Sequence, residues 1–475
     1  MKKKYLLLFS LASFFSNAQC YTRLTSAAQH ITGIKTDGTL WGWGANTGGA
    51  LALTSSTNPA YEQFPVLMGA VSDVWIYNKN GRFNSFAIKS NGTLWATGNN
   101  NYGILGIGSS IGALFSLAQV STATNYVAVD GYDEHSLALR SDGTLWAWGG
   151  NDYNQLGQGT TSTDVLSPIQ VGAATDWTKI AVTGTGGSFA IKANNTLWCW
   201  GRSCSSNLTG SNTITSRPSP FQIGTATNWL FVEPGYCHVL ALKTDNTLWA
   251  WGEYSFGQLG IPGTNGIQSQ TPKQVGTTTW QSIATGRNTS FGVQTNGTLW
   301  VWGENTSGEL GFNDTTNRNA PTQMGTDTNW VSVISGEDHT IAIKNDGTLW
   351  GWGRNYFGAA GNGSFDSGTG FFTPVLVPTQ IPNMCAPLQN ESFSLTTTIS
   401  ISPNPAKEQV NLVFSTALQN PSISIVDVTG KTVLTQNHSA ILNNTSINIA
   451  GLSKGLYLVV VKSEGVVSVE KLVVN

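Results

Sequence analysis

The chain has 475 residues and a formal net charge of −2, and only 11% of its residues are charged. It is too long for one ordinary domain and long enough to bury a large core. No basic tract interrupts this near-neutral balance, which argues against a surface that follows a phosphate backbone, so we expect no nucleic-acid partner.

The first residues predict export. Three lysines at positions 2–4 precede an apolar run over residues 5–15, and small or polar residues 16–18 follow. This order is typical of a secretory signal peptide, and the apolar run is too short to span a bilayer as a stable helix. We therefore predict a signal peptide over residues 1–18 and no transmembrane segment in the mature chain.

An internal repeat dominates the chain from residue 19 to residue 384. The segment K-T-D-G-T-L-W-G-W-G begins at Lys35 and recurs six more times in recognisable form. Its first tryptophans are Trp41, Trp95, Trp146, Trp198, Trp249, Trp300 and Trp350. An even period of about fifty residues built from short strands fits propeller blades of four strands each. The sequence thus predicts an all-β fold, a seven-bladed β-propeller over residues 19–384.

Each repeat contains signals for four strands. The first strand opens with an aromatic residue, as at Trp330. The second and third form a hairpin around an Asp-Gly pair such as Asp142-Gly143, which is the strongest short-range hairpin signal. The fourth carries a P-x-Q pattern, as at Pro168. Proline at the start of a strand suits an outer edge position.

The repeat frame assigns structural roles to residues that would otherwise suggest chemistry. All 18 tryptophans fall at two repeat positions, which favours core packing over an aromatic sugar-binding platform. Four of the five histidines share one repeat position, so we predict a structural hydrogen bond rather than a catalytic base. They are His30, His135, His238 and His339. The aspartates of the hairpins are predicted turn formers.

The segment from Gly131 to Gly157 resembles the repeat of the regulator of chromosome condensation family. It has a Gly shortly before a His, then D-G-T-L-W-A-W-G, then Q-L-G. The resemblance covers about residues 20–382 and implies a closed seven-bladed propeller. It says little about function, because propellers carry many functions. Nucleotide exchange on small GTPases, an activity known in that family, conflicts with export.

After a polar linker over residues 385–399, tryptophan disappears and β-branched residues dominate. Short alternating strands joined by Asn, Gly and Pro turns predict a small β-sandwich over residues 400–475. The S-P-N-P series at 402–405, D-V-T-G-K at 427–431 and L-S-K-G-L-Y at 452–457 resemble the C-terminal sorting domain of the type IX secretion system. This resemblance implies contact with the secretion machinery, then release or attachment at the outer-membrane surface.

The chain has five cysteines, and an oxidising compartment permits disulfides. Cys20 and Cys385 bracket the propeller, so we hypothesise that they form a bridge that locks ring closure. Cys199, Cys204 and Cys237 could give one further pair. Their spacing matches no zinc pattern, and no cofactor or metal motif is found elsewhere.

Function is expected where the repeats differ, in the loop between the repeat glycine and the histidine position. On a ring these loops would form one face with aromatic side chains and mixed charge, suited to protein recognition. The alternative is that they are ordinary solvated loops. The binding-face candidates are Arg82, Phe83, Tyr132, Asp133, Glu134, Tyr236, Arg287, Glu337 and Asp338.

Three function classes follow. The first is a secreted or surface-attached, non-catalytic scaffold that binds an extracellular protein or glycan, with adhesion as one form. The second is an inhibitor of an extracellular hydrolase, because the repeat also resembles that of secreted propellers that block β-lactamases. The third is an enzyme with an unrecognised loop-built site, for example at Asp133, Glu134, Glu337 and Asp338. No nucleophile–base set or phosphate-binding loop supports the third class.

Overall fold

The computed structural model describes residues 21–53, 61–110, 112–159, 163–202, 216–262, 269–361, 374–381, 399–414, 417–427, 432–441, 443–463 and 466–475. The chain divides into two compact units, residues 1–385 and 386–475. The predicted signal peptide lies outside the described residues. No described helix is both long enough and apolar enough to cross a membrane.

The first unit is an all-β propeller, as predicted. Its first strands are β1 (Tyr21–Ser26), β5 (Trp75–Asn80), β9 (Tyr126–Gly131), β13 (Trp177–Val182), β17 (Trp229–Pro234), β20 (Ser269–Thr285) and β24 (Trp330–Ser335). The second strands are β2 (His30–Lys35), β6 (Asn84–Lys89), β10 (His135–Arg140), β14 (Gly187–Lys192), β18 (His238–Lys243), β21 (Thr289–Gln294) and β25 (His339–Lys344).

The remaining strands complete each repeat. The third strands are β3 (Leu40–Ala45), β7 (Leu94–Asn99), β11 (Leu145–Gly149), β15 (Leu197–Arg202), β19 (Thr247–Gly252), β22 (Leu299–Gly303) and β26 (Leu349–Gly353). The fourth strands are β4 (Tyr61–Leu67), β8 (Ala113–Gln119), β12 (Val165–Gln170), β16 (Ser216–Gln222), β23 (Arg318–Gln323) and β27 (Val375–Gln380). Short 3-10 turns lie at Thr47–Gly49, Asn101–Gly103 and Tyr356–Gly358.

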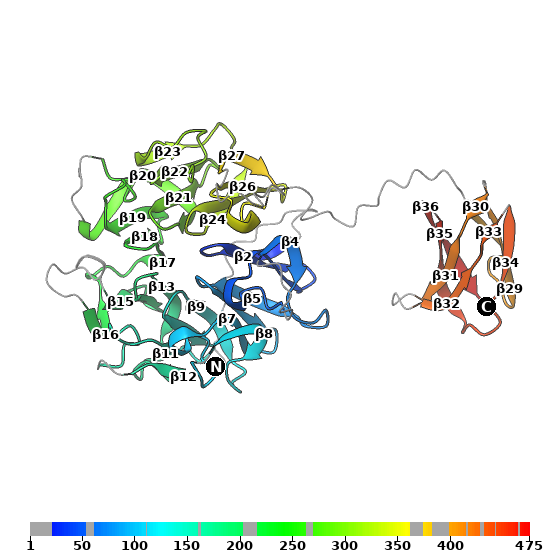
Figure 1. Cartoon of the computed structure of the whole chain (residues 1–475), viewed down its shortest axis with the longest axis horizontal. Coiled ribbons are helices and arrows are strands. Elements are labelled where there is room, and N and C mark those ends of the chain that lie inside the picture. The colour runs from blue at the N-terminus through cyan, green and yellow to red at the C-terminus, as the bar shows by residue number, and fades with distance from the viewer. Residues whose placement is uncertain are drawn as a thin grey trace. The chain divides into compact units, whose positions relative to one another are not determined.

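Strand pairing gives every sequence repeat four antiparallel strands, and we call each such unit a blade. In the described part of the propeller, five blades are separate four-stranded sheets, and blades five and six share one seven-stranded sheet. The 17-residue β20 joins them, since it pairs with β19 as an outer strand and with β21 as an inner strand. Figure 1 shows β5, β9, β13, β17 and β24 around a common centre, with β8, β12, β16 and β23 farther out.

The last blade packs directly on the first. Tyr21 and Ile31 of blade one share a buried cluster with Ile341 and Leu349 of blade seven. Further round the ring, the second tryptophan of the repeat is fully buried between blades, and the Trp148 indole donates to the Ile104 carbonyl of blade two at 2.7 Å. The tryptophans therefore have the structural role that the repeat frame predicts.

The hairpin turns are built by their own side chains. Asp142 accepts hydrogen bonds from the Thr144 backbone N–H at 3.0 Å and from its hydroxyl at 2.6 Å, and the Trp146 indole donates to that hydroxyl at 2.8 Å. These bonds hold the pKa of Asp142 below its usual range. Asn195 and Asn246, which replace the turn glycine, have φ of 59° and 62°, a region that Asn tolerates better than most residues.

One detail of the fourth strand was predicted wrongly. Pro168 is the fourth residue of the six-residue β12, and Pro378 is the fourth of the six-residue β27, so neither opens its strand. Both strands lie at the outer edge of their sheets, where a residue without an N–H leaves no ladder bond unmade.

The second unit is a small β-sandwich. Its strands are β28 (Ile399–Ser402), β29 (Gln409–Phe414), β30 (Leu418–Gln419), β31 (Ser422–Asp427), β32 (Thr432–Asn437), β33 (Ala440–Ile441), β34 (Asn444–Asn448), β35 (Gly455–Ser463) and β36 (Val466–Val474). The sheets β28-β29-β34 and β32-β31-β35-β36 share one core, which includes Leu412, Ile425 and Val459. Asn404 of the S-P-N-P series fixes the entry of the chain, because its side chain bonds to the backbone of Lys471 and Val473.

Candidate binding face and axial channel

The repeated histidines join neighbouring blades. His135 Nε2 lies 2.8 Å from Ser188 Oγ of the next blade, and that hydroxyl donates to the Gln155 carbonyl at 2.8 Å. Since the serine proton is used on the carbonyl, we assign the Nε2–H of His135 as the donor. The same contact recurs at His30–Ser85 and His238–Ser290, whereas His339 Nε2 instead lies 2.8 Å from Ser26 Oγ at the end of the first strand of blade one. Burial lowers the pKa of His135 to about 3, so the ring is neutral, as a structural role requires.

The loops that follow the first strands meet near the ring axis. Arg82 of blade two lies 3.0 Å from Asp133 of blade three and 3.0 Å from Glu337 of blade seven. The Tyr132 hydroxyl donates to Glu337 at 2.9 Å. Four of the candidates chosen from the sequence thus form one network across three blades, which we call the Arg82 cluster (Arg82, Tyr132, Asp133, Glu337). Burial raises the pKa of Glu337, and Arg82 opposes this shift.

Two further candidates complete this end of the axis. The Arg287 guanidinium lies 5.4 Å from the centre of the Tyr236 ring, and the Tyr236 N–H donates to the Arg287 carbonyl at 3.2 Å. The rings of Tyr132 and Tyr236 both pass over Gly184, where an added Cβ would lie 2.8 Å and 2.9 Å from them. A side chain at position 184 would therefore displace both tyrosines.

The other candidates lie around the Arg82 cluster without joining it. Phe83 is half-buried and lies 5.2 Å from the Arg82 guanidinium. Glu134 accepts from the Gln155 side chain at 3.1 Å, and Asp338 lies 3.3 Å from Arg354. We call the face that carries these loops and the Arg82 cluster the loop face.

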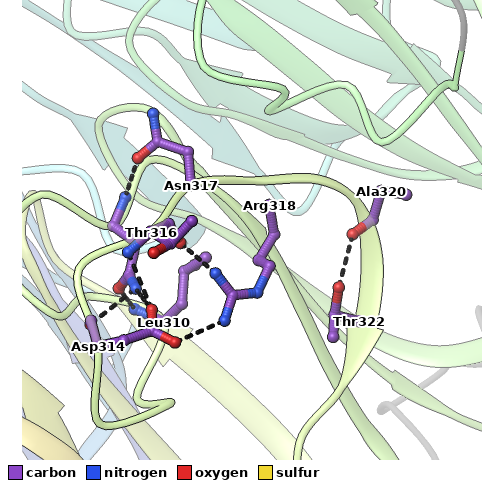
Figure 2. A network of polar contacts seen from close by, with 8 residues as sticks. Leu310, Asp314, Thr316, Asn317, Arg318, Ala320 and Thr322 are labelled. Carbon is purple, nitrogen blue, oxygen red and sulfur yellow. Dashed lines mark hydrogen bonds and ion pairs between the residues drawn. The ribbon is translucent and has the colours of Figure 1, made fainter.

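The loop between the third and fourth strands of blade six also belongs to this face, because Asn288 donates to Glu304 at 2.8 Å. Figure 2 shows its polar network. Asp314 accepts from Arg318 at 2.8 Å and from the Asn305 side chain at 3.0 Å. The carboxylate is thus used in shaping the loop, and within the described ranges no three His, Cys, Asp or Glu side chains converge as metal ligands would.

Behind the loop face, the ends of the first strands enclose a cavity of about 60 Å³. Lys79 lies inside it, 3.6 Å from Asp130 and 3.9 Å from Glu233. Burial raises the pKa of Asp130 to about 6, although Lys79 acts in the opposite direction. A site for a drug-sized ligand usually needs about 300 Å³ or more, and one water needs roughly 10–15 Å³, so this cavity has room for a few waters only.

Comparison with known proteins identifies the family. The model of the RCC1-like domain matches residues 134–402, more than half of the chain. The chain belongs to the RCC1-like domain family. The model of the secretion system C-terminal sorting domain matches residues 400–475. This RCC1-like protein is therefore exported by the type IX route and is secreted or attached to the cell surface.

Its relatives are distant. The chain is 27% identical to the ultraviolet-B receptor UVR8 of Arabidopsis thaliana over 51% of its own length and 56% of the receptor's. It is 26% identical to the E3 ubiquitin-protein ligase HERC2 of Homo sapiens over 60% of its own length and 6% of the ligase's. The chain thus spans about half of one relative and a small part of the other.

Solved structures share the fold. Prp20p of Saccharomyces cerevisiae superposes with a TM-score of 0.64 at 22% identity, covering 77% of this chain and 88% of that one. Human WBSCR16 gives a TM-score of 0.61 at 20% identity, covering 69% of this chain and 88% of that one. At such identities the likeness shows the fold alone.

The cysteines of this RCC1-like chain are only partly described. Cys199 is free and buried, as a small core residue would be. Cys237 is disulfide-bonded, and its partner lies outside the described residues. Cys20 and Cys385 also lie outside them, so the proposed bridge between these two stays a prediction.

Sequence reasoning missed the charged residues of the cavity. Lys79, Asp130 and Glu233 occupy the fifth position of their strands, where other blades carry Thr25, Ala181, Ala284 or Ile334. The sequence did contain one signal for these three residues, which is an ionisable residue near the end of a short, mostly buried strand. It becomes informative only once the first strands are known to face a common axis.

Proposed function

We propose that this RCC1-like propeller is a non-catalytic binding scaffold that presents its loop face to an extracellular protein partner. The observation that carries the proposal is the Arg82 cluster, which fixes loops from three blades in one geometry. Since these side chains are held before any partner arrives, binding would cost less conformational entropy than ordering free loops.

The exposed parts of the loop face suit protein recognition. Arg287 is exposed, and Phe83 is half-buried beside Arg82. Farther from the axis, Tyr102 and Tyr153 are 44% and 37% exposed. Aromatic side chains and arginine are enriched in the central parts of protein interfaces, whereas isolated charges contribute little.

The state of the carboxylates supports a non-catalytic role. Asp133 and Glu337 are paired with Arg82, and Asp338 is paired with Arg354. A general acid or base needs a carboxyl group that can meet a substrate, and the adjacent cavity holds only a few waters. An extracellular hydrolase is one kind of partner that this proposal includes. A large interface and a tight complex would indicate that the propeller inhibits such an enzyme.

The test is capture of surface and secreted proteins by the mature full-length chain, with a glycan array in parallel. The variants Phe83→Ala and Arg287→Ala remove side-chain surface from the loop face, and Phe64→Ala is the matched control, because Phe64 is 58% exposed on the outer strand β4. We expect a saturable partner whose affinity falls about tenfold or more in the loop-face variants. A partner that is lost only with Phe64→Ala, or turnover of a substrate, would overturn the proposal.

A further inference from the structure

Every first strand of the propeller contains a β-bulge one residue after its repeated aromatic residue, which is Tyr21, Trp75, Tyr126, Trp177, Trp229, Trp280 or Trp330. The pairing with the second strand skips one residue in each blade, for example between Trp75 and Tyr77. The bulged residues are Thr22, Ile76, Val127, Thr178, Leu230, Gln281 and Val331. Bulges redirect side chains and are frequent beside functional sites. Here they leave Ile76, Val127 and Leu230 exposed by 56%, 39% and 42%.

The third residues of these strands follow the bulges directly. Side chains alternate along a strand, so the third residue shares its side with the fifth, where Lys79, Asp130 and Glu233 line the cavity. The third residues are Arg23, Tyr77, Ala128, Lys179, Phe231, Ser282 and Ser332. The bulged and third residues lie toward the start of the strands, and the loop face lies beyond the ends of the strands, so these residues form the end of the ring axis opposite the loop face. We call these two sets of residues the channel mouth.

The channel mouth carries positive charge without a matching carboxylate. Among the described residues, neither Arg23 nor Lys179 forms an ion pair, in contrast to Lys79 between its two acids. Arg23 lies 3.9 Å above the Tyr77 ring and donates to the Asn78 carbonyl at 3.0 Å. Partial burial and the charge of Arg23 lower the pKa of Lys179. A carboxylate in the mouth would relieve this repulsion.

Apolar surface lies next to these cations. Phe231 is 37% exposed, and it directly follows the bulged Leu230. The combination distinguishes between classes of anion, since inorganic phosphate would gain nothing from these apolar side chains, and a uronic acid could stack on Phe231 but would gain little from the aliphatic Leu230. A peptide in which an acidic residue neighbours an apolar one would use both features.

We propose that the channel mouth binds an acidic, partly apolar peptide segment of a partner protein, with its carboxylate between Arg23 and Lys179 and its apolar side chain against Leu230 and Phe231. This site lies at the opposite end of the ring axis from the loop face. It stands or fails independently of the function proposed for that face.

The test uses the mature full-length chain and an array of hexapeptides in which Asp or Glu alternates with Leu or Phe. A matched array carries Asn or Gln in place of the acids. We expect binding to the acidic array only, weakened by added salt because the contact is electrostatic. The best peptide, labelled with fluorescein, is then titrated against the variants by fluorescence anisotropy.

Lys179→Gln is the decisive variant, because no described residue bonds to this side chain and the change should leave the fold intact. We expect it to weaken peptide binding roughly tenfold, the loss typical of one charge-assisted hydrogen bond. Leu230→Ser should also weaken binding, whereas Lys273→Gln, the same charge change on an exposed outer strand, should not. Equal binding of acidic and amide peptides, no binding at all, or an unchanged affinity in Lys179→Gln would overturn the inference. Loss of binding only in Phe83→Ala would place the peptide on the loop face instead.

Discussion

Arg82 in the second blade and Glu337 in the last blade form an ion pair at 3.0 Å, with Glu337 only 11% exposed at its side chain. Blade one lies between blades two and seven in the ring. This ion pair therefore links the two blades that flank blade one, close to the point where the ring closes. Because Arg82 also pairs with Asp133, its removal would leave two partly buried carboxylates without their cation.

Replacement of Arg82 by Gln should therefore destabilise the propeller. We expect a loss of about 1–3 kcal/mol in the free energy of unfolding, since a charged group loses its partner in a partly buried site. Arg354→Gln is the matched control, because Arg354 lies 3.3 Å from Asp338 of its own blade, whereas Arg82 joins three blades, so we expect a smaller loss. Urea unfolding followed by tryptophan fluorescence measures both, and equal losses would contradict the special role of Arg82.

Substitutions of a histidine that joins two blades should lower the stability by an amount that depends on the new side chain. His135→Ala removes the donor to Ser188 and opens a small cavity, so we expect a loss of about 2–3 kcal/mol. His135→Asn should cost less, because blade two already carries Asn84 at the equivalent position. Thermal unfolding of the two variants should place the melting temperature of His135→Asn between those of His135→Ala and the natural chain.

The same histidines predict a loss of stability on acidification. Burial lowers the pKa of His30 and His135 to about 3 and of His238 and His339 to about 4, whereas the unfolded chain binds these protons near pH 6.5. The unfolded state therefore binds more protons between these limits. The contribution of the histidines to stability is complete above about pH 6.5 and is lost as the pH falls through about 4 and then about 3.

Carboxyl groups with a raised pKa act against the histidines in the pH dependence of stability. The raised pKa of Asp130, about 6, adds stability below its unfolded value that is lost as the pH rises through 6. Burial also raises the pKa of Asp133, Glu134, Glu309 and Glu337, so the histidine contribution is isolated by comparing each variant with the natural chain. Each His→Asn substitution should reduce the slope between pH 6 and pH 4.5 by roughly 1.4 kcal/mol per pH unit, measured by urea unfolding. An unchanged slope would show that the histidines are protonated in the folded state.

Gly184 offers a test of how closely Tyr132 and Tyr236 pack at the loop face. Gly184→Ala would place a Cβ 2.8 Å from the Tyr132 ring, and we expect a loss of about 1–3 kcal/mol from overpacking. Gly150→Ala is the control, since its Cβ would meet its neighbours at an ordinary 3.4 Å. Gly184→Ala should also weaken partner binding at the loop face, whereas Gly150→Ala should not.

The predicted disulfide is checked by peptide mapping of the secreted chain without reduction. We expect a cross-linked peptide that contains Cys20 and Cys385, because closure of the ring brings the first and last blades together. Free thiols at both positions would refute the bridge. The same map identifies the partner of Cys237.

Local signals in the sequence were sufficient for the repeated parts of this fold. Asp142 and Thr144 form their turn within a few residues, and Trp148 recurs with the period of the blades, so both could be recognised without a structure. The start of β12 before Pro168 was missed because proline marks the edge of a sheet rather than the end of a strand.

The site was harder to predict because its contacts are not local. The variable loops were recognisable as a group, but the sequence held no sign that Arg82 would meet Glu337 rather than solvent. Lys79 and Lys179 belong to no repeat motif, and their environments differ because only Lys79 has acids opposite it on other blades. Such differences arise from which blades face each other across the axis.

Hydrogen–deuterium exchange of the mature chain, with and without its captured partner, tests the central claim most directly. The account predicts slower exchange in the loops around residues 82–83, 132–134 and 287 when the partner is bound, and no change in the outer strands β4 and β8. Protection confined to the outer strands or to the second unit would contradict the assignment of the loop face as the binding surface.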